Sequence, residues 1–252
     1  MIFLVALRKE WMEQWRRSRF VVLGAVLLIF GLTSPLIAKY TPEIIAMVPE
    51  TEDMADLIPE PTAMSAVTQY VQNISQFGVI LALLLTMGAV AREKNRGTAS
   101  LMLVKPLPRS VFLLAKFLML ALMFAITIAA AGAASYYYTW VLFDALDVLN
   151  WLALNGLMLV FLLVYVALTL FCSVLTRSQA AAGGMALGLL FLLGLIGSIP
   201  RVGEFLPGQL IAWGQALMAG EGGSFWPALA VSGGIILVAL AGSILIFERQ
   251  EL

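Results

Sequence analysis

The residues with the clearest chemical pattern lie in one segment, 92–110, which reads REKNRGTASLMLVKPLPRS. Its five bases and single acid surround a short apolar run at 99–104. Gly97 and Thr98 are suited to start a helix there, and Pro106 is suited to end it. A short apolar helix between charged ends presents a hydrophobic surface that needs a cover. The pattern therefore predicts a docking element for a separate, soluble protein.

The sequence lacks the residues that most enzyme and metal sites use. It has no histidine, and its single cysteine, Cys172, has no partner in the chain. His-based acid–base or triad chemistry and the common zinc and copper sites are therefore excluded. No G-x-x-x-x-G-K-[ST] phosphate loop is present, so we expect this chain to bind no metal, cofactor or ATP by itself. The formal net charge of zero gives no indication of a nucleic-acid partner.

Composition places this segment in a membrane protein. Hydrophobic residues make up 62% of the 252 residues and charged residues 12%, and the mean hydropathy is +0.97. Soluble domains carry about 25% charged residues. Uncharged runs long enough to cross a bilayer as helices occur at 20–38, 72–91, 111–136, 151–175, 180–199 and 226–247. We therefore predict an all-α integral membrane protein with a single six-span transmembrane domain at 20–252.

The distribution of basic residues predicts the orientation. With the amino terminus inside, thirteen of the fifteen Lys and Arg residues are cytoplasmic, and only Lys39 and Arg201 are outside. Basic connections are usually retained on the cytoplasmic side. We expect a multi-pass protein of the plasma (inner) membrane with both termini in the cytoplasm. Segment 92–110 then faces the cytoplasm and segment 39–71 forms an outer loop.

Residues 1–19 are predicted to form an amphipathic helix at the cytoplasmic membrane interface. On a helical projection its apolar stripe consists of Leu4, Leu7, Trp11 and Trp15. Its polar face consists of Lys9, Glu10, Glu13, Arg16 and Arg17. The pattern fits a plain membrane-surface anchor and a contact with a partner protein equally well.

Two further segments are predicted on the outer side. The outer loop 39–71 carries six acids against one lysine, and its prolines, Pro42 among them, should prevent a long helix. A short outer helix is predicted at 206–219, before the last span, from a stripe that includes Leu210 and Trp213.

Polar side chains stand at the start of the second predicted span, namely Gln72, Asn73, Ser75 and Gln76. They are explained either as a helix boundary or as the lining of an aqueous path. We favour the boundary.

Segment 92–110 resembles the corresponding loop of the type-2 export permeases of the ATP-binding-cassette (ABC) superfamily. That loop runs Arg-Glu-Lys, Gly-Thr, a leucine-rich turn, Pro and Arg, followed by Gly-Lys in the next span. The matching residues are Arg92, Glu93, Lys94, Gly97, Thr98, Leu101, Met102, Leu103, Pro106, Arg109 and Lys116. The sequence departs from the family pattern at Ala115, where glycine is usual, at Ser100, where an acid is common, and at the extra proline Pro108.

The resemblance extends over nearly the whole chain. Family members also begin with an amphipathic Arg-Lys-Glu helix, matched by Arg8, Lys9 and Glu10, and they have six spans and a short outer helix. The resemblance implies that residues 97–105 form a coupling helix seated in a groove of a separate cytosolic ATPase. Permeases of this family work as dimers with two ATPase subunits, and those subunits bind ATP and Mg²⁺. The chain would then be the permease of an exporter and not an enzyme by itself.

Two other functions remain open. The first is a stand-alone secondary transporter or channel, although the predicted spans carry no acid, histidine or arginine near the bilayer centre to bind a coupling ion. The second is a membrane scaffold that recruits a cytosolic complex through segment 92–110. The sequence does not indicate the substrate.

Overall fold

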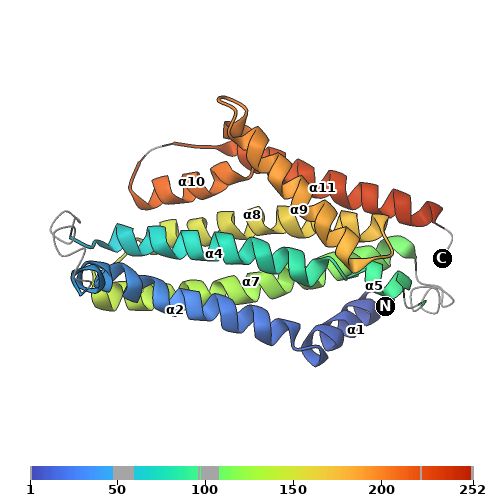
Figure 1. The fold of residues 1–252 in the computed structure, drawn as a ribbon, viewed down its shortest axis with the longest axis horizontal. Coiled ribbons are helices and arrows are strands. Elements are labelled where there is room, and N and C mark those ends of the chain that lie inside the picture. The colour runs from blue at the N-terminus through green and yellow to red at the C-terminus, as the bar shows by residue number, and fades with distance from the viewer. Residues whose placement is uncertain (1, 48–59, 96, 98–107, 222, 251–252) are drawn as a thin grey trace.

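The computed structural model describes residues 2–47, 60–95, 97, 108–221 and 223–250, and within these ranges every regular element is a helix (Figure 1). The long helices are α2 (Arg19–Ala46), α4 (Ala63–Thr86), α7 (Arg109–Leu142), α8 (Val148–Leu175), α9 (Gln179–Gly197) and α11 (Trp226–Arg249). The short elements are α1 (Ile2–Arg16), α5 (Ala91–Asn95), the 3₁₀ turn η1 (Gly203–Phe205) and α10 (Gly208–Met218).

Six helices in the described part of the chain are long and apolar enough to cross a membrane, which confirms the predicted number of spans. The second span runs from Ala63 through α5 to Asn95, and the other five coincide closely with the long helices. A helix satisfies most of its backbone hydrogen bonds internally, as the bilayer core requires.

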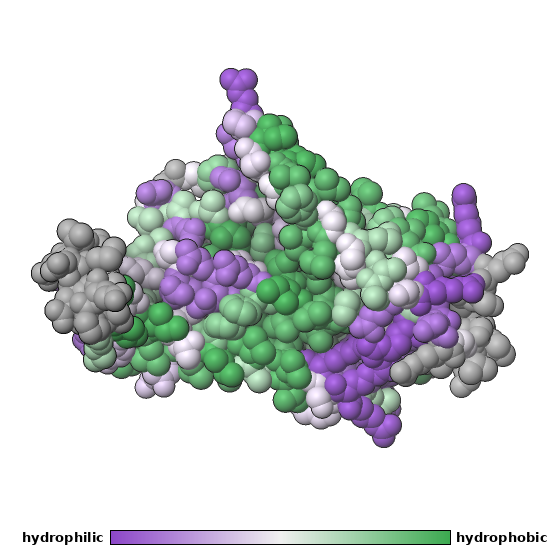
Figure 2. Space-filling view, viewed as in Figure 1, coloured by the Kyte–Doolittle hydropathy of each residue, from purple (hydrophilic) through white to green (hydrophobic). Residues whose placement is uncertain are grey.

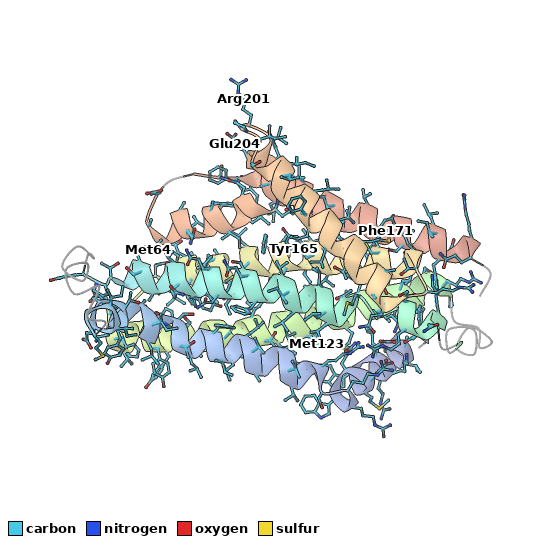
Figure 3. All side chains as sticks on the ribbon, in the orientation of Figure 1. Met64, Met123, Tyr165, Phe171, Arg201 and Glu204 are labelled. Atoms are coloured by element: carbon cyan, nitrogen blue, oxygen red, sulfur yellow. The ribbon has the colours of Figure 1, made fainter. Side chains whose placement is uncertain are left out.

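The spans lie side by side in one bundle, and α1 crosses one end of it (Figure 1). Helices α4, α7 and α8 are the most deeply buried spans, with Phe124, Met158 and Leu162 among the largest fully buried side chains. Helix α9 leans away from the bundle, and Arg201 and Glu204 mark the tip beyond its end (Figure 3). Most of the surface of α2, α9 and α11 is therefore left for lipid or another protein.

Helix α2 is longer than predicted because it continues through two prolines, Pro35 and Pro42. Hydroxyl groups near these prolines donate to carbonyls one turn earlier: Thr33 to Ile29 O at 2.8 Å and Thr41 to Ile37 O at 2.6 Å. Such bonds help to satisfy backbone groups around a proline inside a membrane helix. The prediction that Pro42 would exclude a helix was wrong.

Helix α4 also begins earlier than predicted, at Ala63, where Thr62 and Ser65 form a reciprocal capping box. The predicted outer loop 39–71 is therefore too long at both ends, and its acids at 50–56 lie outside the described residues. Gln72 and Gln76 lie within α4 and not at its start. The helix-boundary explanation of these polar residues was wrong.

The helix predicted at 206–219 is observed as α10, and it runs beside α8 (Figure 1). Its inward side chains Leu210 and Trp213 are buried. Gly220 follows the helix with a φ of 72°, a left-handed conformation that glycine adopts without strain.

Helices α2 and α7 approach closely at Gly31. A Cβ atom at Gly31 would lie 2.5 Å from the carbonyl oxygen of Ala131, which is well inside van der Waals contact. At Gly24, two turns earlier on α2, a Cβ atom would lie 3.6 Å from Thr127 Cγ2, an ordinary contact distance. The packing of the first span on α7 therefore requires glycine at position 31 but not at position 24.

We predict that Gly31→Ala lowers the free energy of unfolding by about 1–3 kcal/mol, because two helix backbones must separate to admit the methyl group. Gly24→Ala is the matched control and should change stability little. Thermal unfolding of the purified chain in detergent measures both. Equal melting temperatures for the two variants would contradict the close contact.

Candidate functional site

Segment 92–110 leaves the bundle from α5 and returns to it at the start of α7. Its first four residues continue as helix α5, so the predicted loop is shorter at that end. Gly97 has a φ of 66°, and its N–H donates to Lys94 O at 3.2 Å. The remaining predicted contact residues lie outside the described part, namely Thr98, Leu101, Met102, Leu103 and Pro106.

Beneath this segment the helices enclose a cluster of charges, which we call the charged junction: Lys9, Glu10, Glu13, Glu93 and Lys116. Its centre is Lys116 on α7, with only 3% of its surface exposed. Lys116 Nζ lies 2.6 Å from a carboxylate oxygen of Glu93 on α5 and 3.1 Å from one of Glu10 on α1. One buried ammonium group therefore joins three helices.

Lys9 extends the junction toward solvent. Its Nζ lies 2.8 Å from Glu10, 3.0 Å from Glu13 and 3.6 Å from Glu93. Arg17 in turn contacts Glu13 at 3.1 Å. With Arg17 added, the three carboxylates of the junction meet three cationic side chains and their charges balance.

Two pKa values are shifted in this junction. Burial of Lys9 favours its neutral form, but the carboxylates of Glu10 and Glu93 outweigh burial and raise the pKa of Lys9 above its ordinary value of 10.5. Burial likewise favours neutral Glu13, but Lys116 and Lys9 outweigh it and lower the pKa of Glu13 below 4.5. Both shifts hold Lys9 and Glu13 in their charged forms around neutral pH.

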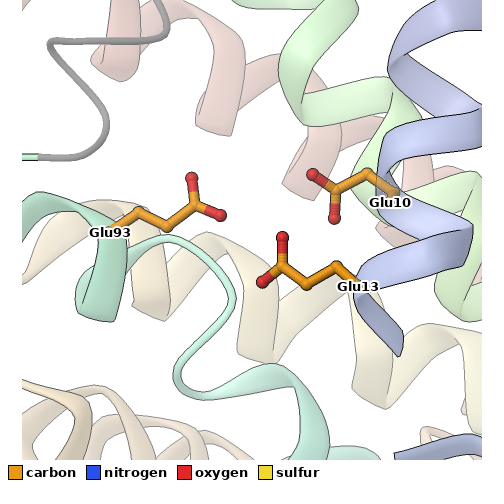
Figure 4. A group of neighbouring side chains, drawn as sticks. All are labelled: Glu10, Glu13 and Glu93. Carbon is orange, nitrogen blue, oxygen red and sulfur yellow. The ribbon is translucent and has the colours of Figure 1, made fainter. Parts of the chain in front are cut away.

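The three carboxylates face one another (Figure 4), and oxygen atoms of all three lie within 4.8 Å. Such a group can bind a metal ion only if its charge is not already balanced. Here the ammonium groups of Lys9 and Lys116 lie between the carboxylates at hydrogen-bond distance. The donor set therefore fits a salt-bridge network and not a metal site.

Helix α5 is fixed on its other side by neighbouring helices. Arg92 donates to Gln179 Oε1 on α9 at 2.6 Å, and Lys94 donates to Gln250 Oε1 at 2.7 Å and to Val174 O. Arg92 and Lys94, which the sequence assigned to the partner contact, therefore also have partners within the chain.

Ser173 on α8 closes the break between α4 and α5. Its hydroxyl accepts the N–H groups of Val90 and Ala91, both at 3.0 Å, and donates to Met87 O at 2.9 Å. A buried backbone donor without a partner is costly, and this one side chain satisfies two.

The other end of the segment is fixed by Arg109, the first residue of α7. Its guanidinium donates to three carbonyls at the carboxyl end of α11, with distances of 2.6 Å to Phe247, 3.1 Å to Glu248 and 2.8 Å to Gln250. A cation at a helix carboxyl terminus satisfies unpaired carbonyls and the helix dipole. Arg109 thus joins α7 to the last span.

Sequence analysis did not find the inward partners of these residues. In α1, Glu10 and Gln14 are buried, whereas Leu4 and Trp15 of the apolar stripe are 69% and 55% exposed. The spacing of Glu10 and Glu13, one turn apart, is equally typical of a solvent-exposed polar face, so it does not indicate burial. A lysine inside an apolar run, Lys116, was the one available signal that a buried acid must lie nearby.

The carboxylates of the junction are paired with ammonium groups, and the junction links several helices. Through α5 and the start of α7, both ends of segment 92–110 are held against α1, α8, α9 and α11. Hydrophilic side chains are dense at this end of the bundle (Figure 2). A displacement of the segment would therefore act on several spans at once.

We predict that Lys116→Met lowers the free energy of unfolding by about 3–5 kcal/mol, because it leaves two buried carboxylates without their cation. The triple variant Lys116→Met, Glu10→Gln, Glu93→Gln removes all three charges and should recover a large part of the loss. Thermal unfolding in detergent reports both. A triple variant no more stable than Lys116→Met would show that lost packing, and not charge, causes the effect.

The pKa shifts predict a stability plateau around neutral pH. The contribution of Glu13, with its lowered pKa, is complete above 4.5 and is lost as the pH falls. That of Lys9, with its raised pKa, is complete below 10.5 and is lost as the pH rises. Melting temperatures measured from about pH 4 to about pH 11 should fall at both ends. In Glu13→Gln the decrease in melting temperature at low pH should be smaller. An unchanged decrease in that variant would show that Glu13 does not cause the loss of stability in acid.

The chain is similar to known membrane proteins over nearly its whole length. The chain is 27% identical over 254 residues to the uncharacterized transmembrane protein YxlG of Bacillus subtilis (strain 168), covering 99% of this chain and 98% of that protein. Residues 4–252 match the model of the family described as ABC-2 family transporter protein. That match includes all six spans, segment 92–110 and nearly all of α1, so the chain belongs to the ABC-2 family of transporter membrane proteins.

Proposed function

We propose that the chain is the permease subunit of an ATP-driven exporter and that segment 92–110 docks on a separate cytosolic ATPase. Two permeases, either two copies of this chain or this chain and a related one, would work with two ATPase subunits that bind ATP and Mg²⁺. Membership in the ABC-2 family supports the permease role. The resemblance of Arg92–Arg109 to the coupling loop of type-2 exporters supports the docking site and the direction of transport.

The observation that carries this proposal is the fixation of both ends of the segment. Glu93 at its start and Lys116 just after its end are joined by a buried ion pair at 2.6 Å, and Arg109 near its end is bonded to the end of α11. A segment with loose ends would bend when pushed. Because these ends are held in the bundle, movement of a docked ATPase would be passed to the spans.

Orientation follows from the positions of the ends of the described chain. The carboxyl end of α11 bonds to Lys94 and Arg109, and α1 bonds to Glu93, so both ends lie beside segment 92–110. Basic residues are concentrated at this end of the bundle, which favours the cytoplasmic side. We therefore place both termini and the charged junction in the cytoplasm of a cell whose plasma membrane holds the six spans.

A permease dimer agrees with the exposure of the spans. Helices α2 and α9 present large apolar side chains, among them Ile29, Phe191 and Leu195, at 51–65% exposure. Helices that pack poorly within one chain leave surface for a second permease as well as for lipid. The path for cargo would then lie between the two copies.

The structure gives less support to a stand-alone transporter. Such proteins use ionisable groups inside the membrane to bind a coupling ion or proton. In the described spans the buried charges Glu93 and Lys116 lie at the end of the bundle and neutralise each other. A membrane scaffold would bind a cytosolic protein without changing its ATP turnover, and this difference separates it from a permease.

The test is the ATPase that accompanies the tagged chain when it is purified from its native membrane. We expect a soluble subunit with a phosphate-binding loop, identified by mass spectrometry, whose ATP hydrolysis changes on assembly with the chain in nanodiscs. Purified chain that moves cargo without such a subunit, or a bound subunit with unchanged turnover, would refute the permease role.

We predict that Gly97→Pro abolishes the effect of the chain on ATP hydrolysis, because proline cannot adopt a φ of 66° or donate the N–H bond to Lys94. Gly220→Pro is the matched control, since Gly220 has a φ of 72° and donates to Leu217 O at 3.3 Å. That variant should retain the effect. Equal behaviour of the two variants would separate segment 92–110 from the ATPase contact.

A further inference from the structure

One stripe of α4 changes from polar to apolar along the helix. Gln69, Gln72 and Gln76 follow one another at spacings of three and four residues, so they share a face. The same face continues as Val79, Ile80, Leu83 and Met87. Figure 2 shows hydrophilic side chains over the first half of α4, within a surface that is otherwise hydrophobic.

The amide part of this stripe lies inside the membrane-spanning length. Helix α4, Ala63–Thr86, has 24 residues and is about 36 Å long, and after the break that follows it the charged residues of α5 begin at Arg92, against about 30 Å of hydrocarbon for the whole span. Gln76 follows Ala63 by about 20 Å, whereas the length from Ala63 to the charged residues of α5 exceeds the hydrocarbon by only about 12 Å, so Gln76 lies inside the hydrocarbon. The carboxamides of Gln72 and Gln76 are exposed, and neither has a hydrogen-bond partner in the described part of the chain. Unsatisfied amides are costly in hydrocarbon, so a polar group must reach them.

The apolar part of the stripe lines a groove of about 660 Å³ between α4, α8 and α9. Gln76 and Ser75 lie at one end and Met87 at the other, so the groove is about 17 Å long along α4. Phe161 and Tyr165 of α8 form its floor, and Leu187 and Leu190 of α9 form its far wall. Figure 3 shows Tyr165 on α8, in the region between α4 and α9. The volume is within the range of small-molecule sites.

Among the residues that the structure describes, no charged side chain lines the groove. A charged ligand would lose its hydration here without gaining a counter-ion. Carboxamides, in contrast, both donate and accept hydrogen bonds and suit hydroxyl, ester or amide groups. Polar and apolar parts follow one another along a single narrow stripe, which matches a molecule with an uncharged head and a long chain.

We propose that this stripe of α4 binds an amphiphile, with an uncharged, hydrogen-bonding head group at Gln72 and Gln76 and a hydrocarbon chain in the groove between α4, α8 and α9. The inference rests on the proposed function, because the amphiphile is the cargo class of the permease. The groove opens toward the surrounding hydrocarbon, so the chain enters from the bilayer. The head group of such an amphiphile forms hydrogen bonds with the exposed amides, and its hydrocarbon chain fills the apolar groove.

The experiment uses the full chain in phosphatidylcholine nanodiscs without detergent or ATPase. The probe is an alkyl glucoside with a photoreactive diazirine in its tail, and labelled positions are identified by peptide mass spectrometry. We expect saturable labelling of groove residues such as Leu83 and Leu187. Probes with the same tail and a sulfate or trimethylammonium head should bind about tenfold more weakly or less.

Two sets of variants separate the groove from ordinary lipid contact. Leu187→Trp fills the groove and should abolish labelling, whereas Leu152→Trp, at an equally exposed leucine on α8, should not: the two side chains are 58% and 62% exposed. Gln72→Leu with Gln76→Leu should raise the half-saturating concentration of glucoside about tenfold.

Labelling that rises without saturation on all exposed helices, or that is unchanged in Leu187→Trp, would overturn the proposal in favour of ordinary lipid contact. Efficient disulfide cross-linking between two copies through Gln76→Cys, unaffected by glucoside, would show that a second copy covers the amides and would also overturn it. Neither result concerns ATPase association, so failure here leaves the permease role to its own test.

Discussion

The ammonium group of Lys116 is buried among the helices and can remain charged there only with carboxylates close by. Moving an ion out of water costs several kcal/mol even in real proteins, and only well-placed counter-charges offset this cost. Glu10 and Glu93 supply them from two different helices. The position of α1 and that of α5 are therefore determined together, because displacement of either would leave a buried charge without its partner.

This constraint explains why an amphipathic helix with exposed tryptophans is also an internal part of the bundle. Helix α1 directs Glu10 and Gln14 inward and leaves Leu4 and Trp15 exposed. One face thus holds the junction and the other is free for the membrane interface, where indole rings are favoured. The salt bridges of Glu10 with Lys116 and of Lys9 with Glu93 hold the polar face of α1 against the bundle. The structure thus adds a contact within the chain to the two explanations of residues 1–19 given by the sequence, a membrane-surface anchor and a contact with a partner protein.

Hydrophobicity alone predicted the six spans because long uncharged runs have few other stable structures. It did not predict where the helices end, since α2 continues through Pro35 and Pro42 and α4 begins with capped polar residues. The motif residues Arg92, Glu93 and Arg109 were recognised, but their partners were not. Gln179, Gln250 and the carbonyls of α11 come from distant parts of the sequence, and only tertiary packing brings them to the segment.

The break between α4 and α5 connects the groove to the charged junction. Met87 lines the end of the groove, and its carbonyl accepts the hydroxyl of Ser173. The same hydroxyl holds the N–H groups of Val90 and Ala91, where α5 begins, and α5 carries Glu93 into the charged junction. Only four residues, 88–91, therefore separate Met87 in the groove from the start of segment 92–110. Because α5 is a short helix held by side-chain bonds, its displacement would move Met87 more readily than it would bend the long helix α4. A displacement of segment 92–110, where we propose that the ATPase docks, would therefore reach the groove directly through α5 and Met87.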